Sequence, residues 1–201
     1  MSSDVQSTFI TAATADPNGL SEAAAVANNA ALVLGGALAS GGAVTFDQPR
    51  NITILSAADD SGISFTVVGT DETATAVTES ITGANTGTAT GTTHFATVAS
   101  ITAVGDPAGN VSAGSGTSIV APMFRGRMRL KGIYVVNTGT AGTITFREES
   151  DSGEVRMKFN TVGSANTAEY PDIPDDGMLF KSGGYVLYTQ TQLSSITVFY
   201  A

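Results

Sequence analysis

The sequence predicts an all-β protein of two small antiparallel β-sandwich or barrel modules, preceded by an extended N-terminal arm. Three observations lead to this fold class. From residue 43 onward, short apolar runs alternate with turn residues about every 8–12 positions, as in sandwiches and barrels. Turn formers are abundant, with 23 glycines among 201 residues. Charge and aromatic content also change together near residue 120, which indicates a boundary between two modules.

The charge is distributed unevenly along the chain. Residues 1–124 contain one arginine and ten carboxylates, a net charge of −9, whereas residues 125–201 contain eight of each and are neutral. All five tyrosines lie in the second of these segments. We therefore expect an arm with a first hairpin over residues 1–42, an acidic Gly/Thr-rich domain over 43–118 and a neutral, aromatic-richer domain over 119–201.

The first twenty residues are polar and contain Pro17-Asn18-Gly19, which predicts an extended arm with little to bury. Deleting residues 1–20 is then expected to weaken attachment without lowering the melting temperature of the isolated protein. Two interpretations stay open for residues 21–34. The alanine-rich run after Ser21 is compatible with a short helix capped by that serine, whereas the glycine pairs after Leu34 favour a strand, a turn and a second strand.

The acidic domain is predicted to contain short strands separated by turns of Asp, Asn, Gly and Pro, as at residues 59–62 and 106–110. The predicted strands span residues 43–46, 51–56, 64–69, 76–82, 94–104 and 111–113. The Gly/Ser-rich residues 114–118 predict a flexible linker to the second domain.

The second domain continues the same pattern. Its predicted strands span residues 128–136, 142–148, 154–160, 184–189 and 195–200. Val155, Met157 and Phe159 alternate with Arg156 and Lys158, which indicates a sheet that is buried on one face. The short connections favour antiparallel pairing, because parallel strands need long crossovers.

The candidate protein-interface residues are four cations that alternate along one predicted strand: Arg125, Arg127, Arg129 and Lys131. On one strand face they repel one another unless acidic groups oppose them. One interpretation is a strip that docks on an acidic neighbour, such as the acidic domain of an adjacent copy. The other is that the glutamates of the following hairpin neutralise the strip internally (Glu148, Glu149 and Glu154). Under the docking interpretation, Arg127→Glu combined with Arg129→Glu should leave the fold intact and abolish assembly.

Other polar groups do not form a recognisable catalytic pattern. The carboxylates of the turn Asp172, Asp175 and Asp176 would suit a hard cation, but their spacing differs from an EF-hand and predicts a rigid turn. His94 is the only histidine and is expected to be structural. The chain contains no G-x-S-x-G elbow, phosphate-binding loop or H-E-x-x-H motif, and no cysteine. We therefore predict no enzyme activity, catalytic residue, cofactor or metal site.

Composition also restricts the partners. A net charge of −9 argues against nucleic-acid binding. Residues 23–42 are too polar to cross a membrane, and the N-terminus lacks the basic region of a secretory leader. Charged residues make up only 13% of the chain, against about 25% in typical soluble domains. Such a surface favours packing against other copies, so we expect a homo-oligomer.

Several runs resemble small β-rich virion proteins of tailed bacteriophages. They are residues 63–71 (ISFTVVGTD), 77–85 (VTESITGAN), 91–101 (GTTHFATVASI), 130–146 (LKGIYVVNTGTAGTITF) and 196–200 (ITVFY). The resemblance covers about residues 40–201 and carries no functional residues with it. It implies a location in the virion and, as partners, the major capsid protein or other virion proteins.

The role that the resemblance favours is a capsid decoration, or cement, protein that stabilises the shell. A neck, tail or fibre-anchoring ring component is the first alternative. A carbohydrate-binding β-module is an alternative of a different class, in which tyrosine rings would serve as sugar platforms. The candidate platforms are Tyr134, Tyr170, Tyr185 and Tyr188.

Overall fold

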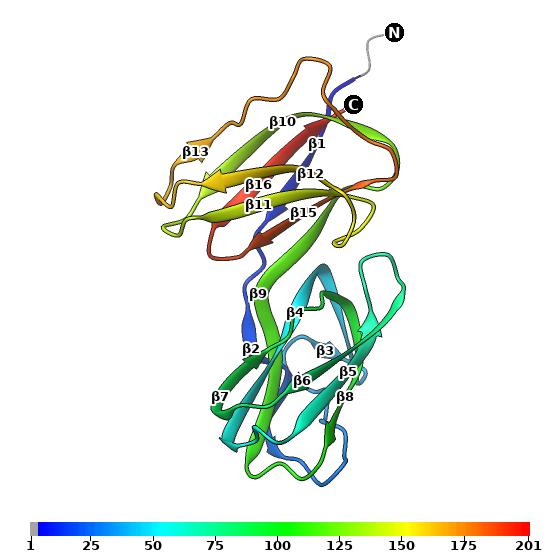
Figure 1. The fold of residues 1–201 in the computed structure, drawn as a ribbon, viewed down its shortest axis with the longest axis vertical. Helices are drawn as coiled ribbons and strands as arrows, with labels where there is room; N and C mark the ends of the chain where they lie inside the picture. Colours follow the sequence, from blue (N-terminus) through cyan, green and yellow to red (C-terminus); the bar gives the residue numbers. More distant parts are fainter. Residues whose placement is uncertain (1–3) are drawn as a thin grey trace. The chain divides into compact units, whose positions relative to one another are not determined.

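The computed structural model describes residues 4–201, which form sixteen β-strands and no helix. Every strand pairing given for these residues is antiparallel, so the predicted all-β antiparallel fold class is confirmed. The chain divides into two compact units, which are coloured along the sequence in Figure 1. Unit 1 comprises Met1–Thr14 and Ser118–Ala201, and unit 2 comprises Ala15–Thr117.

Unit 1 is a β-sandwich. One sheet has the order β1 (Gln6–Thr11), β16 (Leu193–Tyr200), β10 (Met128–Asn137) and β13 (Ala168–Glu169), with β14 (Met178–Phe180) also on β10. The other contains β12 (Val155–Thr161), β11 (Gly142–Glu148), β15 (Gly184–Thr189) and the second half of β9 (Asn110–Phe124). Apolar side chains from both sheets form one core, among them Ile133, Phe146, Val186 and Ile196.

Unit 2 has its own core, which includes Leu20, Ile54, Phe65 and Phe95. Its strands are β2 (Asp16–Ala25), β3 (Ala39–Ser40), β4 (Ala43–Asp59), β5 (Ser64–Thr70), β6 (Ala76–Thr82), β7 (Asn85–Thr90), β8 (Phe95–Val104) and the first half of β9. The main order is β9-β4-β8-β5-β6; β2 pairs with β9, and β3 and β7 pair with β4.

The N-terminal segment is extended, as predicted, but it is not a free arm. Residues 6–11 pair in continuous register with β16, and Figure 1 shows β1 in blue beside β16 in red. Ile10 points into the core of unit 1 and is only 5% exposed, and the Thr8 hydroxyl donates to the Met123 carbonyl at 2.9 Å. The predicted segment 1–42 is thus shared between the two units; its first three residues lie outside the described part.

Residues 21–34 contain no helix. β2 ends at Ala25 and residues 32–34 form no strand, so the strand predicted there is wrong. The second glycine pair, Gly41-Gly42, does form the turn of a short hairpin between β3 and β4. Leu32 and Leu34 are instead buried from a loop that touches β8 through one isolated bridge, Ala31↔Thr102. The loop is anchored by the burial of these two leucines and by backbone hydrogen bonds to β8, from the Leu32 amide to the Ile101 carbonyl at 2.8 Å and from the Ala103 amide to the Ala30 carbonyl at 2.9 Å.

The predicted linker over residues 114–118 is wrong, because these residues lie within the continuous strand β9. Their small size serves close packing. A Cβ on Gly114 would lie 2.2 Å from the Asp16 carbonyl oxygen, and one on Gly116 would lie 2.4 Å from the Asn51 side chain. Between them, the buried Ser115 hydroxyl accepts a hydrogen bond from the Asp16 amide at 3.0 Å. Glycine is required here by neighbouring atoms and does not indicate flexibility.

Candidate interaction surface

The four predicted interface cations do not form one ladder on a strand. β9 ends at Phe124 and β10 begins at Met128, so Arg125 and Arg127 lie in the turn between them. Gly126 takes φ = 111° in that turn, a conformation that suits glycine. Only Arg129 and Lys131 lie on β10. The alternating pattern was interrupted by the glycine, which breaks the strand.

The four cations differ in their contacts. Arg125 and Arg127, which we call the turn cations, are exposed, and neither side chain makes a hydrogen bond or ion pair within residues 4–201. Arg129 instead donates to the Asp176 carbonyl at 3.1 Å, and Lys131 donates to the Asp175 carbonyl at 3.0 Å. The turn cations are therefore available to a partner.

The acidic turn of residues 171–177 thus holds two cations through its backbone carbonyls. Gly177 closes the turn with φ = 74°, and its amide donates to the Pro174 carbonyl at 2.7 Å. Two of the three glutamates proposed as internal partners of the cations pair with another arginine. Glu148 and Glu154 lie 3.6 and 3.2 Å from Arg156. The hypothesis that glutamates of the following hairpin neutralise the four cations was therefore wrong about which residues contact them.

Aromatic side chains gather on the outer face of the sheet β1-β16-β10-β13. Phe9 pairs with Thr197, which pairs on its other side with Tyr134. The Tyr134 ring lies 4.8 Å from that of Tyr170. Phe199 lies on the same face as Thr197, two positions further along β16. Phe9 and Tyr170 are 67% and 71% exposed, so this aromatic face (Phe9, Tyr134, Tyr170 and Phe199) is open to contact.

The aromatic face is continuous with the cations of β10. Met128 and Leu130 point into the core, so Arg129 between them points outward. The Arg129 backbone exchanges two hydrogen bonds with Ala201, at 2.8 and 3.0 Å, which places it roughly 7 Å along the face from Phe199. The sheet therefore brings aromatic residues and cations together across strands.

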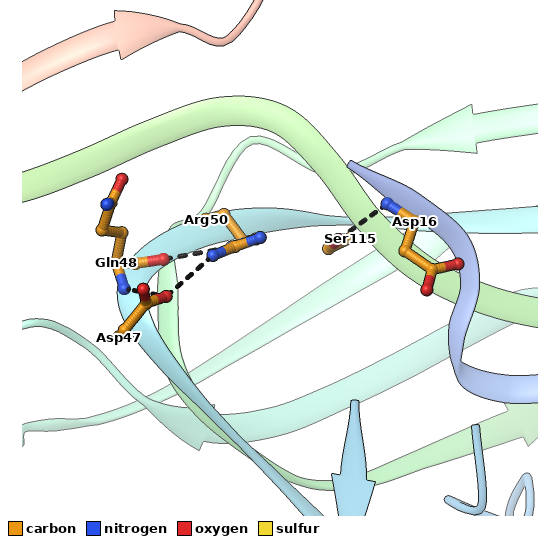
Figure 2. A network of polar contacts seen from close by, with 5 residues as sticks. All are labelled: Asp16, Asp47, Gln48, Arg50 and Ser115. Atoms are coloured by element: carbon orange, nitrogen blue, oxygen red, sulfur yellow. Dashed lines mark hydrogen bonds and ion pairs between the residues drawn. The ribbon is translucent and has the colours of Figure 1, made fainter. Parts of the chain in front are cut away.

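The surface of unit 2 is anionic. Its only cation is Arg50, which is 4% exposed and stacks 4.8 Å above the Phe46 ring. Figure 2 shows the Arg50 guanidinium reaching the Asp47 carboxylate at 3.1 Å and the Gln48 carbonyl at 3.1 Å. Nine carboxylates and this one arginine give residues 15–117 a net charge of −8. Because the cation is internal, the exposed charges of unit 2 are all negative.

Two exposed carboxylates, Asp59 and Asp106, lie at one end of unit 2. The turns that carry them are tied together by the buried Asp60, whose carboxylate accepts from the Ala108 amide at 2.8 Å. Residues close to them in the chain line a groove of about 300 Å³ that is mostly apolar; its lining is Ala23, Leu55, Ser56, Ala57, Thr86, Gly87, Asn110 and Ser112. Leu55 is 38% exposed in this groove. We call the groove and the two carboxylates the acidic end.

Hydrogen bonds within its own turn stabilise the ionised form of Asp59. The Ser61 hydroxyl donates to its carboxylate at 2.7 Å and the Ser61 amide at 3.1 Å, and these bonds lower the pKa of Asp59. Because the pKa of Asp59 is lower in the folded protein than in the unfolded chain, the ionised carboxylate stabilises the fold at pH values above its ordinary pKa. This contribution to stability is lost as the pH falls through the lowered pKa. We expect Ser61→Ala to raise the pKa of Asp59, as measured by NMR titration. An unchanged pKa would show that the hydroxyl is not the main cause.

Other candidates lie elsewhere. His94 is buried just before β8. Tyr185 and Tyr188 are buried in unit 1, so of the four proposed sugar platforms only Tyr134 and Tyr170 are at the surface. Within residues 4–201, no three His, Asp or Glu side chains are grouped closely enough to hold a metal ion.

Comparison with known proteins gives no family for this chain. No protein-family model matches it, and no curated protein matches it either. The part of the chain that the structure describes contains no helix long and apolar enough to cross a membrane.

Proposed function

We propose that this protein is a structural component of a tailed-bacteriophage particle, specifically a capsid decoration protein that stabilises the shell. The turn cations carry this proposal, because Arg125 and Arg127 project from a defined turn and find no partner within the described chain. The exposed aromatic face of the same unit adds apolar contact area. The resemblance of the Gly/Thr-rich hairpins to small virion proteins supports the same role.

A decoration protein binds in many copies, and weak contacts suffice when they are repeated. Surface ion pairs contribute only about 0–1 kcal/mol each, so one copy held by the turn cations would bind weakly. Symmetric repetition and effective concentration multiply such contacts. In this role the protein acts through binding and not through catalysis, with the major capsid protein or other virion proteins as partners.

The number of copies per particle tests the proposal. We expect quantitative mass spectrometry of purified particles to find hundreds of copies, in proportion to the major capsid protein. About a dozen copies would identify a neck, tail or fibre-anchoring ring component instead. The absence of this protein from the particle would reject both roles.

The Tyr134–Tyr170 pair, in which Tyr170 is exposed and Tyr134 half-buried, favours a second candidate function, a carbohydrate-binding module. The two rings lie 4.8 Å apart and are tilted by 40°, and aromatic faces of this kind can stack on sugars. A glycan array with wild-type protein and Tyr170→Ala tests this function. Glycan binding that disappears in the variant would support it, and the lack of any binding would remove it.

A further inference from the structure

We infer that the aromatic face of unit 1 and the turn cations of one copy dock on the acidic end of unit 2 of a second copy. This inference rests on the proposed assembly role and deepens it by assigning the turn cations to contacts between neighbouring copies. It concerns contacts between copies, which can be measured without a particle.

Charge complementarity favours unit 2 of another copy as the occupant. The surface of unit 2 shows carboxylates without any exposed cation, since its only arginine is buried. Unit 1 offers Arg125 and Arg127 without internal partners. Two identical unit 1 surfaces would instead bring like charges together, which is unfavourable. A net charge of −8 on unit 2 also steers the cationic turn toward it over a Debye length of about 8–10 Å.

The apolar parts of the two surfaces also match. Phe9 is 67% exposed at the edge strand β1 and is the most accessible phenylalanine of the aromatic face. The acidic end offers a concave groove of about 300 Å³ in which Ala23, Leu55 and Ala57 present apolar atoms. Asp59 follows the groove residue Ala57 by two positions on β4, and Asp106 precedes the groove residue Asn110 by four, so both carboxylates lie close in the chain to the lining of the groove. An aromatic anchor in an apolar pocket with charges at the rim is a common interface plan.

The contact joins two different surfaces and is therefore heterologous. Repetition of a heterologous contact generates a closed ring or an open filament, depending on the rotation between copies. The shared face is small: four strands about 4.8 Å apart and about six residues long cover roughly 20 Å by 20 Å. Interfaces of this size are weak, so we expect association in solution only at high protein concentration.

Analytical ultracentrifugation of the full chain over a range of concentrations tests the inference. Wild-type protein should form dimers and larger species as its concentration is raised to about 0.5 mM. These species should dissociate as the salt concentration is raised, because salt screens the charges at the rim of the interface. Arg125→Glu combined with Arg127→Glu should weaken association at least about tenfold, and Phe9→Ser should have a similar effect. Gly139→Ala, in open space on unit 1, serves as the matched control and should associate as wild type.

A charge-reversal experiment identifies the partner surface. Asp59→Lys combined with Asp106→Lys should also abolish association, and mixing this variant with the Arg125→Glu/Arg127→Glu variant should restore it as an alternating complex. Circular dichroism verifies that each variant is folded.

Several results would overturn the inference. A wild-type protein that stays monomeric throughout, unchanged association in the turn-cation variant, or failure of the mixed variants to associate would each do so. Binding of a single-stranded thymine oligonucleotide at the aromatic face, lost in Phe9→Ser, would assign the face to nucleic acid instead. None of these outcomes bears on the copy number in particles, so the proposed function would stand or fall separately.

Discussion

Gly114→Ala is expected to destabilise unit 2 by at least about 2 kcal/mol, near the upper part of the range for overpacked positions. The added Cβ would lie 2.2 Å from the Asp16 carbonyl oxygen and 2.3 Å from the Pro17 carbonyl carbon. Both are backbone atoms of β2, which cannot rotate away as a side chain can. Urea unfolding, with hydrogen exchange to identify the amides of residues 15–117, measures the effect.

The same substitution separates two interpretations of residues 114–118. In a flexible linker, replacing glycine with alanine would stabilise the protein by about 0.4–1 kcal/mol, because it restricts the unfolded chain. Gly139→Ala again provides the control, since its Cβ would meet no atom within 4 Å; we expect a change within about 0.5 kcal/mol. If Gly114→Ala behaves like this control, the close approach of β2 to β9 is not present.

Ile10→Ala is expected to destabilise unit 1 by about 2–5 kcal/mol, the usual range for such a change in a core. Ile10 is 5% exposed and belongs to the core of unit 1, although it lies only ten residues from the start of the sequence. Its neighbour Phe9 points to the opposite face and is 67% exposed. Phe9→Ala should therefore change stability by no more than about 0.5 kcal/mol. Thermal and urea unfolding of the two variants measure the difference.

This pair of variants also revises an expectation for the N-terminal segment. A free arm could be deleted without lowering the melting temperature, whereas removal of residues 1–20 would expose the edge of β16 and remove Ile10 and Leu20 from two cores. We therefore expect the deletion to unfold the protein or to lower its melting temperature sharply. Equal stability of Ile10→Ala and Phe9→Ala would contradict the observed register of β1.

The turn cations illustrate how far a strand pattern can predict a site. Alternation correctly placed Arg129 on the outer face of β10, but it also assumed that the strand continued back to Arg125. Gly126 lies between strands with a positive φ, so the turn cations are displaced from the strand and left without partners. The backbone carbonyls that hold Arg129 and Lys131 come from residues more than forty positions away. Side-chain composition contains no signal for such a carbonyl contact.

Sequence patterns alone are enough to predict the all-β class, most strands of both units and the charge asymmetry between them. These features follow from local periodicity, turn residues and composition, each of which can be recognised in a short stretch of sequence. Strands β5, β6, β11 and β15 were predicted within a residue of their observed bounds for this reason. β7, with the sequence NTGTAT, was missed because it contains no large apolar residue and is held by its pairing with β4.

Which distant segments share a sheet depends on tertiary contacts that no local pattern contains. The polar N-terminal segment became a strand because β16 offered an unpaired edge, and residues 114–118 became part of β9 because neighbouring backbone fills the space beside their glycines. The aromatic face arises in the same way, since Phe9, Tyr134, Tyr170 and Phe199 come from four separate segments. Pairing between strands joins residues that are far apart in the chain, so its outcome depends on the complete set of partners and not on any local pattern.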